Sequence, residues 1–354
     1  MKLNIVHKID SFAKLGDILR NPDLELYRSF KTEIGQLRDL IISSTQYNPW
    51  FTPSSVKAAL YATGQSLQKN KIEKWLSRYD LKKLECKKKK TIGVVMAGNI
   101  PLVGFHDFIS VLISGNRLLA KLSSDDNQLL PVLSRMLIKI EPSFAGDIHF
   151  INGKLENFDA IIATGSDNTA RYFGFYFGKY PHIIRKNRNG VAVLTGSETD
   201  KHLTGLGEDI FGYFGLGCRS VSKMFIPKGF SFERFYENLS DYVDVINHHK
   251  YRNNYDYHKS VYLVNRVHHL DNGFLMLKED EMMASPPAVV FYEYYNNVSE
   301  LNQLLQQKEQ RIQCVVSIDK NVKNSIPPGT AQHPELWDYA DGIDTISFLS
   351  NLVK

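Results

Sequence analysis

Cysteine is the residue in this chain whose type and setting best suit covalent chemistry. Cys218 lies in the segment 211–227, where three of the seven residues before it are glycines. Glycines allow a sharp turn and a close approach of a second molecule to the backbone. The neighbouring Arg219 would favour the thiolate form of a thiol at position 218. A buried, unreactive side chain is the competing interpretation, and the local sequence favours neither.

The other two cysteines have less suggestive settings. Cys314 lies within an apolar, strand-like segment and Cys86 precedes a run of lysines, so we interpret both as packing residues. Three scattered cysteines do not form a disulfide framework, and they suit a reducing compartment. No run approaches the ~20 apolar residues of a membrane span, and no signal peptide is recognisable. We therefore expect a cytoplasmic protein.

Length and composition bound the possibilities further. A chain of 354 residues predicts about two domains, at ~150 residues per domain. With 43% hydrophobic and 23% charged residues, the chain is not disordered throughout. The 43 basic and 38 acidic residues give a net charge of +5 and a mixed surface, so no nucleic-acid partner is expected. No metal-ligand spacing occurs, and we expect no metal.

Hydrophobic periodicity predicts a helical N-terminal segment followed by two α/β series. Apolar residues recur at helical spacing in 5–19, 24–42 and 56–67. The lysine run 87–90 is interpreted as a solvated connection. Short apolar strands then alternate with amphipathic helices, which predicts a parallel, doubly wound sheet. The strands are expected at 92–97, 117–122, 148–151 and 159–163.

The second series begins near Asn189–Gly190. Its strands are expected at 191–194, 223–226, 288–291 and 312–318, with helices at 201–214 and 301–307. We therefore expect a helical segment 1–90, a cofactor-binding α/β domain 91–189 and a catalytic α/β domain 190–325 that carries Cys218. Segments 1–90 and 326–354 are expected to pack on the cofactor domain.

Four short motifs occur in the order and rough spacing of the aldehyde dehydrogenase superfamily. They are Gly-Asn-Ile-Pro (98–101), Gly-Asn (115–116) followed by Lys121, Ala-Thr-Gly-Ser (163–166) and Gly-Cys (217–218). Two longer phrases, at 94–107 and 336–344, resemble the long-chain acyl-CoA reductases of the LuxC type. The resemblance covers about residues 90–350. It implies an aldehyde dehydrogenase-like fold, with a doubly wound cofactor domain beside an α/β catalytic domain.

The resemblance also implies catalytic roles. Cys218 would attack a thioester carbonyl and displace coenzyme A to give an acyl-enzyme. The Cys218 backbone N–H and the Asn99 side-chain amide would stabilise the oxyanion. Asn99 could instead cap a helix that begins at Pro101, and we favour the oxyanion role.

The cofactor implied by the resemblance is NADPH, with NADH possible. Ser124 falls near the position that is often glutamate in NAD-preferring members, and a serine there does not repel a 2′-phosphate. Thr164, Gly165 and Ser166 would meet the pyrophosphate at a helix N-terminus, or would form only a strand-to-helix turn. The full set of expected cofactor-binding residues is Lys121, Ser123, Ser124, Thr164, Gly165, Ser166 and Thr169.

One departure from the superfamily bears on the reaction. Its hydrolytic members carry a glutamate that activates water, whereas the corresponding stretch 183–190 contains no carboxylate. Without a general base the acyl-enzyme would persist. This favours acyl-CoA reduction over aldehyde oxidation. Arg185, Lys186 and Arg188 in this stretch could meet coenzyme A phosphates or form a solvated basic face, and we favour the basic face.

These observations predict an NADPH-dependent reductase that converts a long-chain acyl-CoA or acyl-thioester into a fatty aldehyde. The aromatic run 172–177 favours an apolar substrate, or belongs to the core. The rivals are an acyl-phosphate reductase of amino-acid biosynthesis, an acyltransferase or acyl-carrier protein that needs no nicotinamide, and a non-catalytic scaffold. An acyl-donating enzyme and a second copy of the chain are the candidate protein partners.

Overall fold

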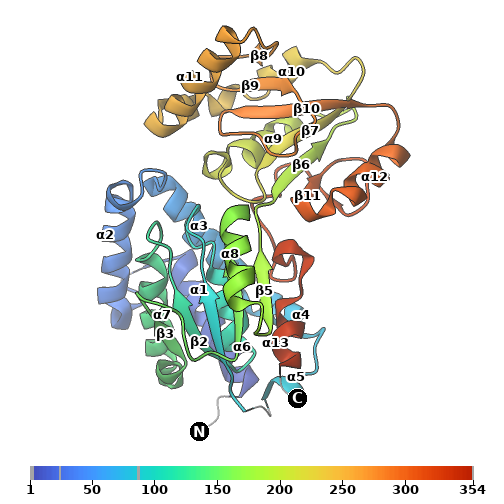
Figure 1. Cartoon of the computed structure of the whole chain (residues 1–354). Coiled ribbons are helices and arrows are strands. Elements are labelled where there is room, and N and C mark those ends of the chain that lie inside the picture. Colours follow the sequence, from blue (N-terminus) through green and yellow to red (C-terminus); the bar gives the residue numbers. More distant parts are fainter. Residues whose placement is uncertain (1–3, 24, 86–87, 353–354) are drawn as a thin grey trace. The chain divides into compact units, whose positions relative to one another are not determined.

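The computed structural model describes residues 4–23, 25–85 and 88–352, and the chain folds into two compact units (Figure 1). Unit 1 comprises Met1–Lys186 and Glu335–Lys354, and unit 2 comprises Asn187–Pro334. Cys86 and Lys87, for which the sequence suggested roles, lie outside the described residues. Within the described ranges, no helix has both the length and the apolar character needed to cross a bilayer.

Unit 1 begins with helices, as the periodicity predicts. Asn4 and Thr52 cap α1 and α3, since their side chains accept the Val6 and Ser55 backbone N–H groups. The five N-terminal helices are α1 (Ile5–Arg20), α2 (Lys31–Tyr47), α3 (Pro53–Ser66), α4 (Lys69–Leu76) and α5 (Leu81–Glu85).

Leu24, where the second helix was expected to begin, lies outside the described residues, and the prediction of an α-helix over 25–30 is wrong. The Asp23 carboxylate accepts the Glu25 N–H at 2.8 Å, which forms a local turn that competes with a helix. A short 3₁₀ segment, Arg28–Phe30, follows, and α2 begins only at Lys31.

The sheet of unit 1 is five-stranded and parallel, in the order β3-β2-β1-β4-β5. Helices α6 (Phe105–Ile113), α7 (Leu129–Ile140) and α8 (Asp167–Phe177) connect strands. The strand order reverses between β1 and β4. The strands are β1 (Thr91–Val95), β2 (Arg117–Lys121), β3 (Ile148–Phe150), β4 (Ala160–Thr164) and β5 (His182–Arg185).

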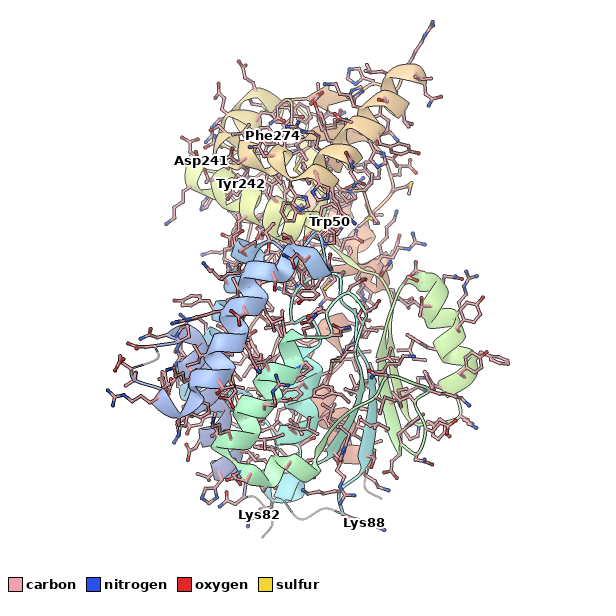
Figure 2. All side chains as sticks on the ribbon, turned by 90° about the vertical axis from the view of Figure 1, so that its left-hand side faces the viewer. Trp50, Lys82, Lys88, Asp241, Tyr242 and Phe274 are labelled. Carbon is pink, nitrogen blue, oxygen red and sulfur yellow. The ribbon has the colours of Figure 1, made fainter. Side chains whose placement is uncertain are left out.

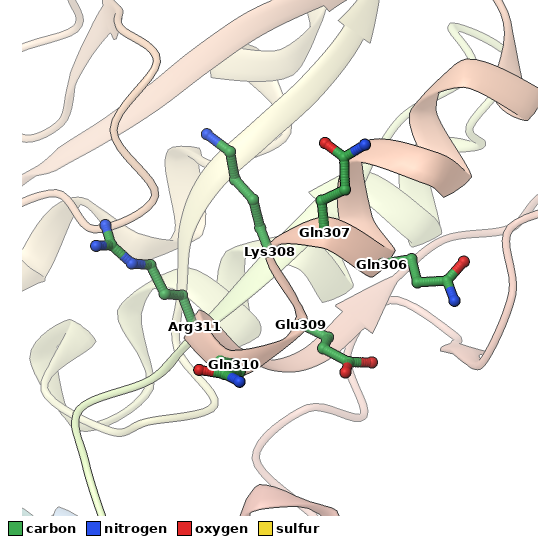
Figure 3. A pocket seen from close by; sticks show the side chains of 6 residues that line it. All are labelled: Gln306, Gln307, Lys308, Glu309, Gln310 and Arg311. Carbon is green, nitrogen blue, oxygen red and sulfur yellow. The ribbon is translucent and has the colours of Figure 1, made fainter.

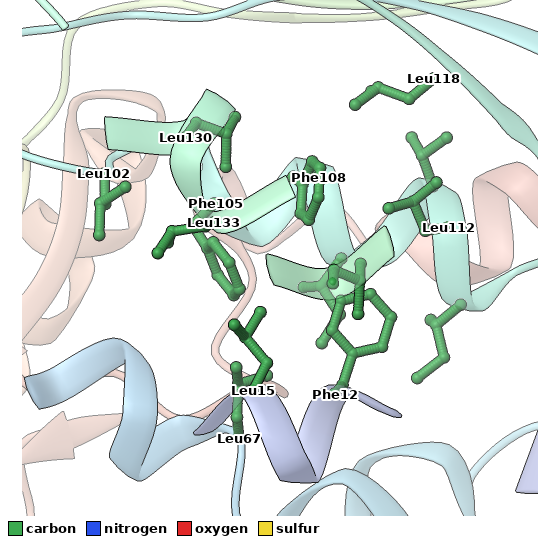
Figure 4. Packing of buried hydrophobic residues seen from close by; sticks show 14 of the residues in the cluster. Phe12, Leu15, Leu67, Leu102, Phe105, Phe108, Leu112, Leu118, Leu130 and Leu133 are labelled. Atoms are coloured by element: carbon green, nitrogen blue, oxygen red, sulfur yellow. The ribbon is translucent and has the colours of Figure 1, made fainter. Parts of the chain in front are cut away.

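Both faces of this sheet are covered, as a doubly wound fold requires. Alternate residues of β4 belong to different apolar clusters: Ala160 and Ile162 to the larger one, Ile161 and Ala163 to the smaller. Phe173 and Phe177 of α8 pack against the smaller cluster. Figure 4 shows the larger cluster, in which Leu67, directly after α3, packs with labelled side chains of α1, α6 and α7: Phe12, Leu15, Phe105, Phe108, Leu112, Leu130 and Leu133.

The segment 335–354 completes unit 1 from the far end of the sequence. Leu336, Ile346 and Leu349 are buried in the larger cluster, the last two on helix α13 (Thr345–Asn351). Tyr79 donates a hydrogen bond to the Asp344 carboxylate at 2.9 Å, which fixes the start of α13 against the N-terminal helices.

Unit 2 contains a seven-stranded sheet in the order β12-β11-β6-β7-β10-β9-β8, parallel except for the β8–β9 pair. Its helices are α9 (Asp200–Phe211), α10 (Phe232–Glu237), α11 (His249–Val264) and α12 (Val298–Gln307). Its strands are β6 (Asn189–Val193), β7 (Val221–Pro227), β8 (Leu270–Asp271), β9 (Met276–Glu279), β10 (Val289–Tyr295), β11 (Ile312–Val316) and β12 (Ser325–Ile326).

Leu349→Ala should destabilise unit 1 by about 2–5 kcal/mol, because it leaves a cavity at a side chain that is 1% exposed. The three tryptophans, Trp50, Trp75 and Trp337, all belong to unit 1, so tryptophan fluorescence during denaturant unfolding reports on this unit. Ile343→Ala is the matched control, since Ile343 is 38% exposed in the same segment. Equal effects of the two substitutions would contradict a structural role for the buried tail.

Candidate functional site

The residues expected to bind the cofactor lie at one edge of the unit 1 sheet. Lys121 ends β2 and Thr164 ends β4, while Asn99 follows β1 in the same direction. Parallel strands place their carboxyl ends at a common edge, and ligands bind there, beside the point where strand order reverses. The structure therefore brings the expected cofactor residues and Asn99 to the binding edge of this unit.

The loops after β1 and β2 are packed tightly together. A Cβ atom at Gly98 would lie 2.6 Å from the Ser123 Oγ atom, so only glycine fits without displacement. The Leu102 N–H donates to the Asp126 carboxylate at 2.7 Å, and Leu102 itself has a φ of 60°. A non-glycine residue rarely adopts this conformation, and the surrounding contacts must hold it in place.

Asn99 is exposed in the bend after β1 and does not cap the next helix. Helix α6 begins at Phe105, after a turn at 101–104, and its N-cap residue Gly104 makes no side-chain cap. The capping alternative is therefore wrong. The oxyanion role stays a prediction.

The loop after β2 presents polar groups to solvent. Lys121 and Ser124 are exposed, whereas Ser123 is half-buried and its Oγ accepts the Asp125 N–H at 3.2 Å. The Asn48 amide donates to the Asp125 carbonyl at 3.3 Å and so fixes this loop against the end of α2.

The turn between β4 and α8 is a capped helix start. Ser166 Oγ accepts the Thr169 N–H at 3.2 Å and lies 2.9 Å from Thr169 Oγ1. A Cβ at Gly165 would lie 3.0 Å from the Thr169 Cβ, so the turn packs closely on the first turn of α8. Such a helix start still leaves early N–H groups without intrahelical partners, which suits an anion.

Cys218 lies in unit 2, in the turn that directly precedes β7, and is half-exposed. The chain reaches it through Tyr213, Phe214 and Gly215, which have φ angles of 51°, 59° and 77°. This left-handed run ends α9 at Phe211, so the prediction of a helix continuing to Phe214 is wrong. Two non-glycine residues in the left-handed region store strain next to the proposed nucleophile.

Hydrogen bonds close the Cys218 turn on itself. The Ser220 N–H donates to the Gly217 carbonyl at 3.0 Å, and the Gly217 N–H donates to Ser220 Oγ at 3.2 Å. A Cβ at Gly190 would lie 2.5 Å from the Arg219 carbonyl oxygen, so the start of β6 must be glycine to let the turn approach.

The guanidinium of Arg219 forms a hydrogen bond to the backbone of a distant segment of unit 2. Its Nε donates to the Ala331 carbonyl at 2.5 Å. Cys314 is buried in β11 and its thiol contacts the Arg219 carbonyl at 3.7 Å, which confirms its interpretation as a packing residue.

The stretch that lacks a general base is partly buried. Arg185 is 5% exposed and forms a 2.6 Å ion pair with Asp107 and a 3.1 Å hydrogen bond to Thr345. Arg188 donates to the Glu309 and Ile312 carbonyls. The interpretation of these two arginines as a solvated basic face is therefore wrong, since internal acceptors bind both, and only Lys186 is exposed.

The aromatic run 172–177 divides between core and surface. Phe173 and Phe177 pack in the smaller cluster, whereas Phe175 is 84% exposed. A separate aromatic cluster in unit 2 contains Phe211, whose ring contacts those of Tyr242 and Phe274, the latter two labelled in Figure 2. Of the hollows on the described surface, the one of about 450 Å³ at 306–311 (Figure 3) includes none of the expected site residues.

Two carboxylates that the sequence analysis missed hold loops beside the expected residues. Burial raises the pKa of Asp126 to about 6, although the Leu102 N–H partly opposes the shift. Burial also raises the pKa of Asp209 to about 6, against the N–H donors of Gly329 and Ala331. The sequence contains one signal that could have identified Asp209 as a buried carboxylate: it is an acidic residue on an otherwise apolar face of a predicted helix.

Asp126→Asn should stabilise unit 1 by about 1–3 kcal/mol at pH 7.5, with the gain vanishing below about pH 4. The folded-state pKa lies above the unfolded value of about 3.9, so the folded state binds the proton more tightly and wild-type stability falls as the pH rises from about 4 to about 6. The asparagine oxygen can still accept the Leu102 N–H. Denaturant unfolding followed by tryptophan fluorescence at several pH values measures the difference, and a gain independent of pH would contradict the assignment.

Comparison with solved structures places this geometry among the aldehyde dehydrogenases. An NAD-dependent aldehyde dehydrogenase from Sinorhizobium meliloti matches with a TM-score of 0.63 at 10% identity, covering 91% of this chain and 72% of that one. Aldehyde dehydrogenase 21 from Physcomitrella patens, solved with succinate, matches with a TM-score of 0.59 at 13% identity, covering 89% and 78%. At these identities the likeness shows the fold.

A third structural match is the Delta-pyrroline-5-carboxylate dehydrogenase from Mycobacterium tuberculosis, with a TM-score of 0.54 at 12% identity, covering 90% of this chain and 67% of that one. No curated protein sequence matches the chain. The family model for acyl-CoA reductase (LuxC) matches residues 47–285, which is more than half of the sequence and includes both Asn99 and Cys218. The chain therefore belongs to the LuxC acyl-CoA reductase family and has an aldehyde dehydrogenase-like fold.

Proposed function

We propose that this protein reduces a long-chain acyl-CoA or acyl-thioester to the fatty aldehyde with NADPH, through an acyl-enzyme on Cys218. The observation that carries the proposal is the half-exposed thiol in a turn that follows two strained residues, Tyr213 and Phe214, in a chain of the acyl-CoA reductase family. A strained turn at a nucleophile is a common way to present a reactive side chain. The substrate class comes from the family.

Acyl transfer is the step in which the chain's own residues act. The Cys218 thiolate forms a bond to the thioester carbonyl carbon, the bond from that carbon to the coenzyme A sulfur breaks, and coenzyme A leaves as the thiol after taking up a proton. The backbone N–H of Cys218 and the amide of Asn99 donate to the oxyanion. When bound, the nicotinamide supplies the hydride that releases the acyl group as an aldehyde and returns the cysteine thiolate.

The polar edge of the unit 1 sheet supports a dinucleotide cofactor. Lys121 is exposed at the end of β2, where it can meet a ribose, and the capped start of α8 suits a pyrophosphate. The carboxyl edge of the unit 1 sheet therefore offers both a cation, Lys121, and the N-terminus of α8. These hydrogen-bond donors fit the negatively charged phosphates of a dinucleotide. The remaining residues of the proposed set are Ser123, Ser124, Thr164, Gly165, Ser166 and Thr169.

The stretch that carries a glutamate base in hydrolytic relatives offers no group here to activate water. The stretch 183–190 holds no carboxylate, and its central arginine, Arg185, is buried in an ion pair with Asp107. Without a base to activate it, water attacks a thioester slowly. The acyl-enzyme is then available for reduction.

Cys218→Ala should abolish NADPH consumption with a long-chain acyl-CoA while leaving NADPH binding intact, because the nucleophile is lost and the cofactor edge in unit 1 is not. Absorbance at 340 nm and equilibrium binding measure the two effects. Cys314→Ala is the matched control and should keep most of the activity, since that thiol is buried in β11.

The same assay separates the rival functions. Consumption that survives Cys218→Ala would contradict the acyl-enzyme. Acylation of Cys218 without NADPH binding would favour an acyltransferase, and a faster rate with γ-glutamyl phosphate would favour an acyl-phosphate reductase. Asn99→Ala should slow acylation about 10²–10³-fold if its amide binds the oxyanion.

Ser124→Glu should reverse the cofactor preference from NADPH towards NADH. A carboxylate at this exposed position would repel a ribose 2′-phosphate, which NADH lacks. The measurement is the ratio of kcat/KM for the two cofactors, which should change by tenfold or more in favour of NADH. An unchanged ratio would show that Ser124 does not face the ribose.

A further inference from the structure

The segment 327–333 of unit 2, here called the strap, lies along one face of helix α9. A Cβ at Gly205 would lie 3.1 Å from the Pro328 carbonyl oxygen, and one at Gly212 would lie 2.8 Å from the Gln332 Cγ. Gly205 and Asp209 are four residues apart and share a face of α9, and Gly212 directly follows the end of the helix. The strap is therefore seated where small residues leave room for it.

Asp209 provides the polar contacts that hold the strap on α9. Its side chain is fully buried, and its two carboxylate oxygens accept the Gly329 N–H at 2.7 Å and the Ala331 N–H at 2.8 Å. A buried carboxylate is stable only with such partners. Gly329 has a φ of 83°, so the strap turns sharply between the two N–H groups.

The strap in turn holds the residues that follow Cys218. The Ala331 carbonyl accepts the Arg219 Nε–H, and the Gln332 amide donates to Ser220 Oγ at 3.3 Å and to the Asp209 carbonyl at 3.4 Å. Ser220 Oγ also accepts the N–H of Gly217, on the other side of the cysteine. One network thus connects the buried carboxylate with both neighbours of Cys218.

We infer that Asp209 is a positioning residue for the nucleophile: its carboxylate fixes the strap, and the strap fixes the turn that presents Cys218. The inference deepens the proposed function, because it assumes that Cys218 is the reacting group. The contacts themselves do not depend on the substrate. Asp209 acts through Gly329, Ala331 and Gln332 and makes no contact with substrate.

Asp209→Asn is the sharpest test, because it preserves the shape of the side chain but places an NH₂ group against one of the two N–H donors. Single-turnover release of coenzyme A gives a rate constant for acylation and an amplitude for the fraction of competent sites. We expect the rate constant to fall about tenfold with the amplitude retained. A lower amplitude with an unchanged rate constant would show a purely structural role and overturn the inference.

Glu208→Gln is the matched control. Glu208 is the adjacent residue, and its carboxylate forms only an exposed 2.7 Å contact with His333 of the strap. This variant should change the acylation rate constant less than twofold. A loss as large as that of Asp209→Asn would contradict the special role of the buried carboxylate.

Hydrogen exchange tests the coupling without reference to any substrate. In Asp209→Asn, the amides of the strap and of residues 217–220 should exchange at least tenfold faster, while those of β7 keep their wild-type rates. Faster exchange in the strap alone would overturn the inference even if the protein reduces acyl-CoA. If the wild type forms no acyl-enzyme, the proposed function fails, and the exchange result still decides whether Asp209 fixes the turn.

Gln332→Ala covers the case in which Asp209→Asn loosens all of unit 2. It removes the hydrogen bonds of the Gln332 amide to Ser220 and to the Asp209 backbone carbonyl, together with the packing of the side chain on Gly212, and leaves the carboxylate in place. Faster exchange at 217–220, with β7 unchanged, would support the inference. Unchanged exchange at 217–220 would overturn it.

Discussion

Close packing of neighbouring segments, at positions where only glycine fits, shapes the loops that carry the proposed residues within each unit. Gly98 lets the loop after β1 contact Ser123 of the loop after β2. Gly190 lets the start of β6 contact the Arg219 carbonyl beside Cys218. A methyl group at either position would force these segments apart, because the nearest atoms would lie 2.5–2.6 Å from it. In unit 2 the contact is between two main chains, and in unit 1 it is between a glycine and a serine side chain.

Two carboxylates, the half-buried Asp126 and the fully buried Asp209, hold close-packed loops in place. Asp126 accepts the Leu102 N–H in unit 1, and Asp209 accepts two strap N–H groups in unit 2. In both, burial raises the pKa, so the ionised form is maintained against a desolvation penalty. A loop that lacks a regular ladder needs other acceptors for its N–H groups, and a carboxylate supplies two oxygens at once. The family match and the fold give the reaction class, and these anchors account for the shape of the proposed site.

Hydrophobic periodicity predicted the α/β class and the strands β1–β4, β6, β7, β10 and β11, because each is short, apolar and bounded by turn residues. It did not predict β5, β8, β9 or β12. It also predicted which segments pack against the sheets, since burial follows the same spacing. It failed at the start of α2, where Asp23 forms a local turn, and also at the start of α6 and the end of α9. At the start of α6, the Leu102 N–H is bound by Asp126, 24 residues away, and at the end of α9 the chain turns left-handed at Tyr213 and Phe214. Neither feature is encoded by local propensity.

The sequence predicted which residues are candidates for the site and their order along the chain. It did not predict the residues that hold them in position. Cys218 and its glycines are visible in the sequence, but the strap that lies against them comes from more than 100 positions later. The arginines at 185 and 188 illustrate the same limit. A run of basic residues resembles a solvated surface until the fold shows that Asp107 and backbone carbonyls bind them.

The C-terminal segment has a consequence for biosynthesis. Leu336, Ile346 and Leu349 belong to the core that also contains Phe12 and Trp75, and Thr345 completes the partners of Arg185. During translation, unit 1 cannot complete its core until all of unit 2 has been synthesised, because these side chains follow unit 2 in the sequence. Its apolar surface stays open on the ribosome for as long as unit 2 takes to emerge. Newly made chains are therefore a natural client for chaperones that shield exposed hydrophobic surface.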